Sequence, residues 1–135
     1  MALIPFELFL KTRLAAASAQ VCGDPEPSLA MMAGDPSSYF SPDGAVADTA
    51  RTARQEIERT AAHCRPGGTC EFEVIHTEER DGIAFWAGYQ HAAIMLQGEA
   101  ALRPISLRVT EIFRAGDQGW GLSHRHADPV RSAKD

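Results

Sequence analysis

Apolar and polar side chains alternate most regularly between residues 104 and 129. From Leu107 to Phe113, successive residues fall on opposite sides of the chain, an alternation that sorts side chains onto separate faces only in a strand. Residues 115–119 hold glycines and an aspartate, which favour a chain reversal. The pattern predicts a β-hairpin whose second strand begins near Trp120.

The register of this hairpin follows from matching the apolar faces of its strands. A slip by one residue would turn Leu122 away from the face that holds Val109 and Phe113. The matched register gives these cross-strand pairs: Glu111 with Leu122, Val109 with His124, and Leu107 with His126. A carboxylate and two imidazoles would then share an otherwise apolar face, which indicates a ligand pocket.

In the N-terminal half, apolar residues recur at the intervals of three and four that are typical of amphipathic helices. A first helix is expected over residues 3–21, with a core stripe made of Leu3, Phe6, Leu10, Leu14, Ala17 and Val21. A short helix is expected over residues 24–34 and a longer one over residues 48–65. We interpret Met31 and Met32 in the short helix as core residues.

Further strands are expected on both sides of the third helix. Residues 37–41 predict a short strand in which Tyr39 or Phe40 faces inward. Asp81-Gly82 is a strong signal for a two-residue hairpin turn. That turn predicts these pairs: Phe72 with His91, Val74 with Tyr89, and His76 with Ala87. The inward face of the strand after the turn would carry Ile83, Phe85, Ala87, Tyr89 and His91.

The length of 135 residues is that of one domain, residues 1–135, with a single core. A net charge of −5 without any basic run makes nucleic acid an unexpected partner. The apolar N-terminal stretch is interrupted by Glu7, Lys11 and Arg13, so neither a signal peptide nor a membrane span is expected.

The cysteines indicate a reducing compartment. Cys22, Cys64 and Cys70 are odd in number and lack the spacing of a metal site. Buried thiols are the favoured interpretation, although Cys64 and Cys70 could pair across their short loop. We therefore expect a cytoplasmic protein.

Two segments resemble a known family. RVTEIFRAGDQGWGLSHRHADP at residues 108–129 is similar to the C-terminal hairpin of SnoaL-like proteins, and GDPEPSLAMMAGD at residues 23–35 resembles their second-helix segment. SnoaL-like proteins belong to the NTF2-like superfamily, which includes ketosteroid isomerase. The resemblance spans nearly the whole chain and implies an α+β cone-shaped fold, in which a curved antiparallel sheet wraps around about three N-terminal helices.

The resemblance also allows the machinery of ketosteroid isomerase to be placed on this chain. Its general base would fall at Phe40 or Ser41, its first-helix tyrosine near Ala16, and its sheet aspartate at Glu111. Two of these three functions lack a suitable side chain, so isomerisation by that mechanism is not expected.

The candidate ligand-binding residues are Tyr39, Tyr89, His91, Glu111, His124 and His126. In a catalytic version, Glu111 and His124 would act as an acid/base pair. The alternative is structural: Glu111 is a carboxylate satisfied by a neighbour, and the histidines tie the last strand to the first helix. No metal is expected, because the histidines lack an HxxxH or HExxH spacing, and no cofactor is expected.

Three functional hypotheses follow. The first is a pocket that binds a small apolar or aromatic ligand, and the second adds isomerase, cyclase or lyase chemistry on a small cyclic or carbonyl compound. The third is a non-catalytic association module whose own side chains fill the pocket. In each case we expect a homodimer through the outer face of the sheet, where Ile75, Trp86 and Ile112 would be exposed.

Overall fold

The computed structural model describes residues 3–131. Its helices are α1 (Phe6–Val21), α2 (Glu26–Ala30) and α3 (Ala50–Ala62). Its strands are β1 (Ser38–Phe40), β2 (Val46–Ala47), β3 (Cys64–Arg80), β4 (Ile83–Leu96), β5 (Arg103–Gly116) and β6 (Gly119–Pro129). The strands form one sheet in the order β2-β1-β6-β5-β4-β3, in which β1 runs parallel to β6 and the other neighbours are antiparallel.

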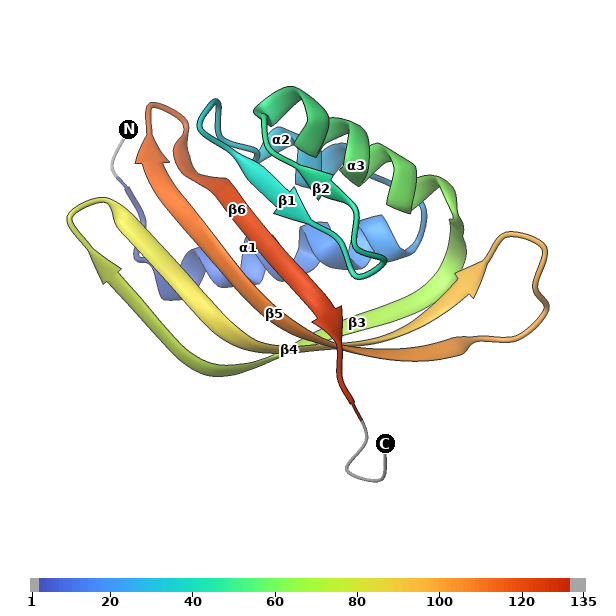
Figure 1. Cartoon of the computed structure of the whole chain (residues 1–135). Helices are drawn as coiled ribbons and strands as arrows, with labels where there is room; N and C mark the ends of the chain where they lie inside the picture. The colour runs from blue at the N-terminus through green and yellow to red at the C-terminus, as the bar shows by residue number, and fades with distance from the viewer. Residues whose placement is uncertain (1–2, 132–135) are drawn as a thin grey trace.

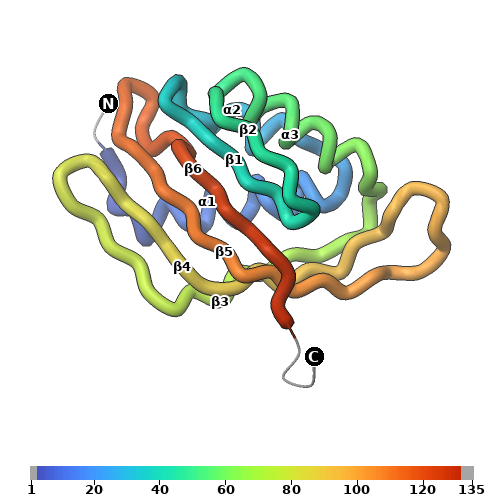
Figure 2. The backbone as a smooth tube through the Cα atoms, viewed as in Figure 1, coloured from blue at the N-terminus to red at the C-terminus, as the bar shows by residue number. Residues whose placement is uncertain are grey.

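The long strands bend around α1, which lies along the concave side of the sheet, and α3 lies beside the short strands β1 and β2 (Figure 1). The tube in Figure 2 shows how β3, β4 and β5 curve together beneath the helices. This arrangement confirms the expected α+β cone fold. The sheet is mixed rather than wholly antiparallel, because β1 joins it alongside β6.

Helix α1 is confirmed, but its buried stripe differs from the predicted one. The buried residues are Phe6, Phe9, Arg13, Ala16 and Ala17. Leu3 lies outside the helix with 40% of its surface exposed. The buried stripe of α1 includes Arg13. A stripe predicted from apolar residues alone leaves this position out, because arginine is polar.

The Asp81-Gly82 hairpin turn is confirmed, but the predicted faces of β4 are inverted. Arg80 pairs with Ile83 across the turn, and His76 pairs with Ala87 as predicted. The other two predicted pairs are wrong, because β3 contains an irregularity between Val74 and His76 that shifts the register. As a result Glu71 pairs with His91 and Glu73 pairs with Tyr89.

The inward residues of β4 are Ala84, Trp86 and Gln90, all of which are buried. Both sets of alternating positions in this strand contain apolar side chains, so alternation alone could not select the inner one. Trp86 is fully buried, which corrects its predicted place on the outer face.

The β5–β6 hairpin turn is also confirmed, with Gly116 opposite Gly119. The predicted register is wrong along the whole hairpin, since Leu122 pairs with Phe113 and not with Glu111. Phe113 pairs with Leu122, but Ile112 pairs with His124, so Ser123 is an extra residue in β6. The observed pairs further along are Glu111 with Arg125, Thr110 with His126, and Val109 with Ala127.

Hydrogen bonds hold this bulge in place. The Ser123 hydroxyl accepts a hydrogen bond from Arg114 Nε at 3.0 Å and donates one to the Pro36 carbonyl at 3.1 Å. Beyond the bulge, Arg125 and Ala127 occupy the inner face, while His124 and His126 face outward. One inserted residue thus exchanges the faces of the second half of the strand.

The core fills the space between α1 and the sheet. Phe6 packs against Phe113 and Trp120 with ring centroids 5.0 and 5.5 Å apart, respectively. A second cluster, made of Leu29, Tyr39, Ala47, Ala53 and Ile57, joins α3 to α2, β1 and β2. The first cluster fixes α1 against the inner face of the sheet, and the second holds α3 beside α2 and the short strands.

Gly88 permits the close approach of β3 at its irregularity, since a Cβ at this position would overlap the Glu73 carbonyl oxygen. We predict that Gly88→Ala lowers the free energy of unfolding by about 2–3 kcal/mol. Gly34→Ala is the matched control, because a Cβ there meets no atom within 4 Å. Urea unfolding measures both variants, and equal stabilities would contradict the predicted clash.

Candidate functional site

Glu111 is completely buried at the centre of a polar cluster. Its Oε1 accepts hydrogen bonds from Arg13 Nε at 2.9 Å and Trp86 Nε1 at 2.8 Å. Its Oε2 accepts hydrogen bonds from Arg13 and Arg125, both at 2.7 Å. Both carboxylate oxygens are therefore occupied by donors from the protein itself.

Each donor reaches Glu111 from a different element. Arg13 comes from the buried stripe of α1 and is 1% exposed, and Trp86 comes from the inner face of β4. Arg125 comes from β6, directly across from Glu111, and is 6% exposed. Arg125 faces inward because the bulge at Ser123 reverses the alternation of the strand.

The arginines decide the charge of Glu111. Burial alone would raise the pKa of this carboxyl group, but the charges and hydrogen bonds of Arg13 and Arg125 outweigh burial and lower the pKa to about 2. Glu111 is therefore ionised at neutral pH. With its pKa depressed and its oxygens occupied, it is neither a proton donor nor an available base.

A small cavity lies beside this cluster. Its volume is about 40 Å³, and it is lined by Arg13, Ala17, Gln20, Val21, Tyr39, Gln90 and Arg125. Arg125 donates a hydrogen bond to Gln90 Oε1 at 2.7 Å, and its guanidinium carbon lies 6.0 Å from the centroid of the Tyr39 ring. Tyr39 is thus the inward residue of β1, which settles the choice between Tyr39 and Phe40.

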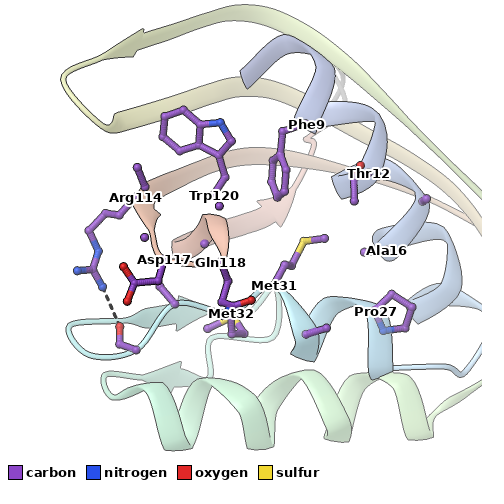
Figure 3. Close-up of a pocket in the computed structure, with 18 of the residues that line it drawn as sticks. Phe9, Thr12, Ala16, Pro27, Met31, Met32, Arg114, Asp117, Gln118 and Trp120 are labelled. Atoms are coloured by element: carbon purple, nitrogen blue, oxygen red, sulfur yellow. Dashed lines mark hydrogen bonds between the residues drawn. The ribbon is translucent and has the colours of Figure 1, made fainter. Parts of the chain in front are cut away.

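A much larger hollow of about 710 Å³ opens between α1, α2 and the β5–β6 turn. Close up, the rings of Phe9 and Trp120 lie along one side of the hollow, and Met31, Met32 and Pro27 lie along the other (Figure 3). Met31 and Met32 are half-buried and pack against the core, as predicted. They also line this hollow, which the sequence did not indicate.

Polar groups lie at the rim of the hollow. Its lining includes the polar residues Thr12, Asp35, Arg114, Asp117 and Gln118. Arg114 donates to the carbonyl oxygens of Gly34 and Pro36 at 2.8 and 2.9 Å. Backbone hydrogen bonds from Ala33 N to Leu122 O and from Leu122 N to Met31 O, at 2.9 and 2.7 Å, fasten the end of α2 to β6. This rim is therefore tied to the sheet.

The predicted shared face of Glu111, His124 and His126 is wrong. His124 and His126 lie on the outer face, where the Phe40 ring contacts both imidazoles at 5.0 and 5.5 Å between centroids. His124 Nδ1 is 2.7 Å from Ser38 Oγ. Burial, followed by the nearby His126, lowers the pKa of His124. Glu111 and His124 therefore do not meet as an acid/base pair.

Tyr89 and His91 also lie on the outer face. Their rings are stacked with centroids 5.9 Å apart, and His91 lies 2.9 Å from both Glu73 Oε1 and Ser106 Oγ. Of the predicted ligand-binding residues, Tyr39 and Glu111 are thus the ones that face the interior. Sequence reasoning missed Arg13 and Arg125; the signal for Arg13 was its helical spacing from Phe6 and Phe9.

No protein-family model matches the sequence, and no curated protein matches it. Several solved structures match the chain. A protein from Streptomyces avermitilis, provisionally named a dehydratase of the NTF2-like family, matches with a TM-score of 0.76 and 18% identity over 94% of this chain and 97% of its own. An NTF2-like superfamily protein from Salmonella enterica matches with a TM-score of 0.74 and 13% identity over 92% and 87% of the two chains.

The chain has the NTF2-like fold. A third similar structure, from Thiobacillus denitrificans, is provisionally named a calcium/calmodulin-dependent protein kinase type II association domain. It matches with a TM-score of 0.73 and 16% identity over 97% of this chain and 100% of its own. At these identities the likeness establishes the fold and leaves the chemistry to the residues of the site.

Within this NTF2-like fold, the positions that the resemblance matched to the base and the tyrosine of ketosteroid isomerase carry no such side chains. Phe40 faces outward, and Ser41 donates a 2.6 Å hydrogen bond to Glu56 Oε1. Ala16 is buried in α1 and lines the large hollow. Glu111 is inside the cone but is held by arginines. The interior therefore offers a charged cluster where that enzyme has an oxyanion hole.

Within residues 3–131, no helix is long and apolar enough to cross a membrane. In the same range, no three His, Cys, Asp or Glu side chains gather closely enough to hold a metal ion.

The charge balance of the cluster predicts unequal effects of substitution. Glu111→Gln leaves Arg13 and Arg125 buried without a counter-charge, so we expect it to lower the free energy of unfolding by about 3–5 kcal/mol. Arg13→Met leaves Glu111 paired with Arg125 and should cost less. Urea unfolding measures both variants.

Arg103→Met is the control for this comparison, because Arg103 forms an exposed ion pair with Glu99 at 2.7 Å. Its loss should cost at most about 1 kcal/mol. A smaller loss for Glu111→Gln than for Arg13→Met would contradict the proposed role of the glutamate.

Proposed function

We propose that this protein binds a small, mostly apolar molecule in the hollow between α1, α2 and the β5–β6 turn. The observation that carries the proposal is the cavity of about 710 Å³, a size typical of sites for small molecules. Its walls are largely apolar, and its polar groups gather at the rim. This combination favours a ligand with an apolar body and a polar end.

The walls support a particular ligand shape. Trp120 is held by the core and by a 2.8 Å hydrogen bond from its Nε1 to the Ile4 carbonyl, so its ring is a fixed surface. Met31 and Met32 opposite can adjust, because methionine is flexible and polarisable. A planar or ring-containing ligand would pack between these surfaces, with Thr12 or Gln118 available to hydrogen-bond its polar end.

Binding is favoured over acid/base catalysis by the chemistry of the lining. Among the described residues that line the hollow, none is a histidine, cysteine or lysine, and its carboxylates, Asp35 and Asp117, are exposed rather than held inside it. Glu111 lies outside this lining, and its oxygens are occupied by Arg13, Arg125 and Trp86. The open volume likewise argues against a pocket filled by the protein's own side chains.

Blocking the hollow should abolish binding. We predict that the neutral fluorescent probe N-phenyl-1-naphthylamine binds the wild-type protein saturably and that Ala30→Trp weakens this binding at least about tenfold. Ala30 is exposed and lines the hollow, so the larger ring obstructs it without entering the core. Fluorescence titration measures the dissociation constants.

The matched control is Ala101→Trp, which places the same ring at an exposed position outside this lining. It should bind the probe like the wild type. Equal affinity of the Ala30→Trp variant, or no saturable binding by the wild type, would overturn the proposed function.

For the outer face of the sheet, we propose a second copy of this chain as the partner. The helices cover the concave side, which leaves this face open (Figure 1). It carries a groove of about 350 Å³ whose lining includes Ile75, Ala87 and Tyr89, and Ile75 is 62% exposed. Ile112 also lies on this face, half-buried opposite His124. Trp86, which was predicted to lie on this face, is buried inside the protein, and Tyr89 lies on this face instead.

The charges on this face are self-complementary. Arg108 binds Asp128 through contacts of 2.6 and 2.8 Å, and His91 lies beside Glu73. Positive and negative side chains both occur on this face. Two copies related by a twofold axis can therefore place the positive groups of one copy opposite the negative groups of the other. The structure from Thiobacillus denitrificans that resembles this chain is itself named as an association domain.

Ile75→Glu would place a carboxylate in this contact. We predict that the wild type sediments as a dimer at about 100 μM and that Ile75→Glu weakens the dimer at least about tenfold. Val46→Glu is the control, since Val46 is 69% exposed on the short edge strand β2. Analytical ultracentrifugation measures all three proteins. A monomeric wild type, or an unaffected Ile75→Glu dimer, would refute this interface.

A further inference from the structure

The buried cluster around Glu111 carries an excess of positive charge. Arg13 and Arg125 contribute two guanidinium groups, whereas Glu111 contributes one carboxylate, and all three are at least nine-tenths buried. Both guanidinium groups are cations, because arginine keeps its charge in proteins. One positive charge therefore remains uncompensated inside the cone, where an isolated charge is costly.

The neighbouring side chains do not neutralise this charge. Within residues 3–131, Glu111 is the carboxylate that hydrogen-bonds to either arginine. Burial raises the pKa of the nearby Cys70 thiol to about 11, so that thiol is neutral at pH 7. Gln90 and Ser28 accept hydrogen bonds from the arginines but carry no charge.

The cavity of about 40 Å³ lies where the missing charge would be needed. Arg13 and Arg125 both line it, together with the side-chain amides of Gln20 and Gln90 and the ring of Tyr39. A guanidinium group is a hydrogen-bond donor without an acceptor and carries a positive charge, so the two arginines suit an anionic acceptor. The volume admits one group a little larger than a water molecule.

We propose that this cavity binds a small monovalent anion, of the size of chloride, nitrate or formate, between Arg13 and Arg125. The anion completes the charge balance of the cluster: two cations against Glu111 and one bound anion. The site is separate from the large hollow, because the two linings share no residue. Bulky anions such as gluconate are excluded by the volume of the cavity.

A thermal melt at constant ionic strength tests the proposal. Sodium gluconate is replaced stepwise by sodium chloride, nitrate or formate while the melting temperature is measured. Because the anion binds the folded state, the melting temperature should rise and then level off with each small anion, by about 5 °C at roughly ten times the dissociation constant. Equal melting temperatures in gluconate and in all three small anions would overturn the proposal.

Variants locate the effect. Arg13→Met leaves one guanidinium and one carboxylate, so the dependence on small anions should disappear. Arg103→Met removes an exposed arginine instead and should retain the full rise. An unchanged rise in Arg13→Met would place the anion elsewhere and contradict the assignment.

Crystals of the wild type grown in sodium bromide give a direct answer that does not depend on the folding of any variant. We expect an anomalous peak between Arg13 and Arg125. A water molecule or no density at that position, in crystals that hold bromide elsewhere, would refute the site.

Discussion

The structure depends on the burial of Glu111 between Arg13 and Arg125. This contact joins the middle of α1 to β5 and β6. Trp86 of β4 donates a hydrogen bond to the same carboxylate, so β4 is joined to it as well. Because the pKa of Glu111 is lowered, its pairing stabilises the folded state above its ordinary pKa of 4.5, and that contribution is lost as the pH falls toward about 2. The helix is thereby fixed on the concave face.

Fixing α1 in this way divides the molecule into regions with different chemistry. Around Glu111 the interior is charged and nearly filled, whereas toward the β5–β6 turn the same helix and sheet diverge and leave an apolar hollow. The outer face receives the histidines that the bulge in β6 turns away from the interior. The proposed sites of ligand binding, anion binding and self-association accordingly lie at separate places on one small fold.

The sequence predicted the elements and turns well, because helical spacing and Asp81-Gly82 are local signals. It also predicted the inward face of β5, where Leu107, Val109, Glu111 and Phe113 are buried as expected, but it gave the wrong faces for β4 and for the second half of β6. The irregularity beside Ile75 and the extra residue Ser123 each exchange the faces of all residues beyond them, and neither leaves a local signature. Arg13 was missed for a different reason: its burial depends on a partner 98 positions away.

The ionisation of Glu111 is the most direct test of this account. A ¹³C NMR titration of its side-chain carboxyl group, identified by comparison with the Glu111→Gln variant, follows the protonation of that one residue. The account predicts a pKa of about 2, so that the resonance stays in its ionised position down to about pH 3. A midpoint at the ordinary value of 4.5 or higher would show that the arginines do not hold a buried carboxylate, and would contradict the account.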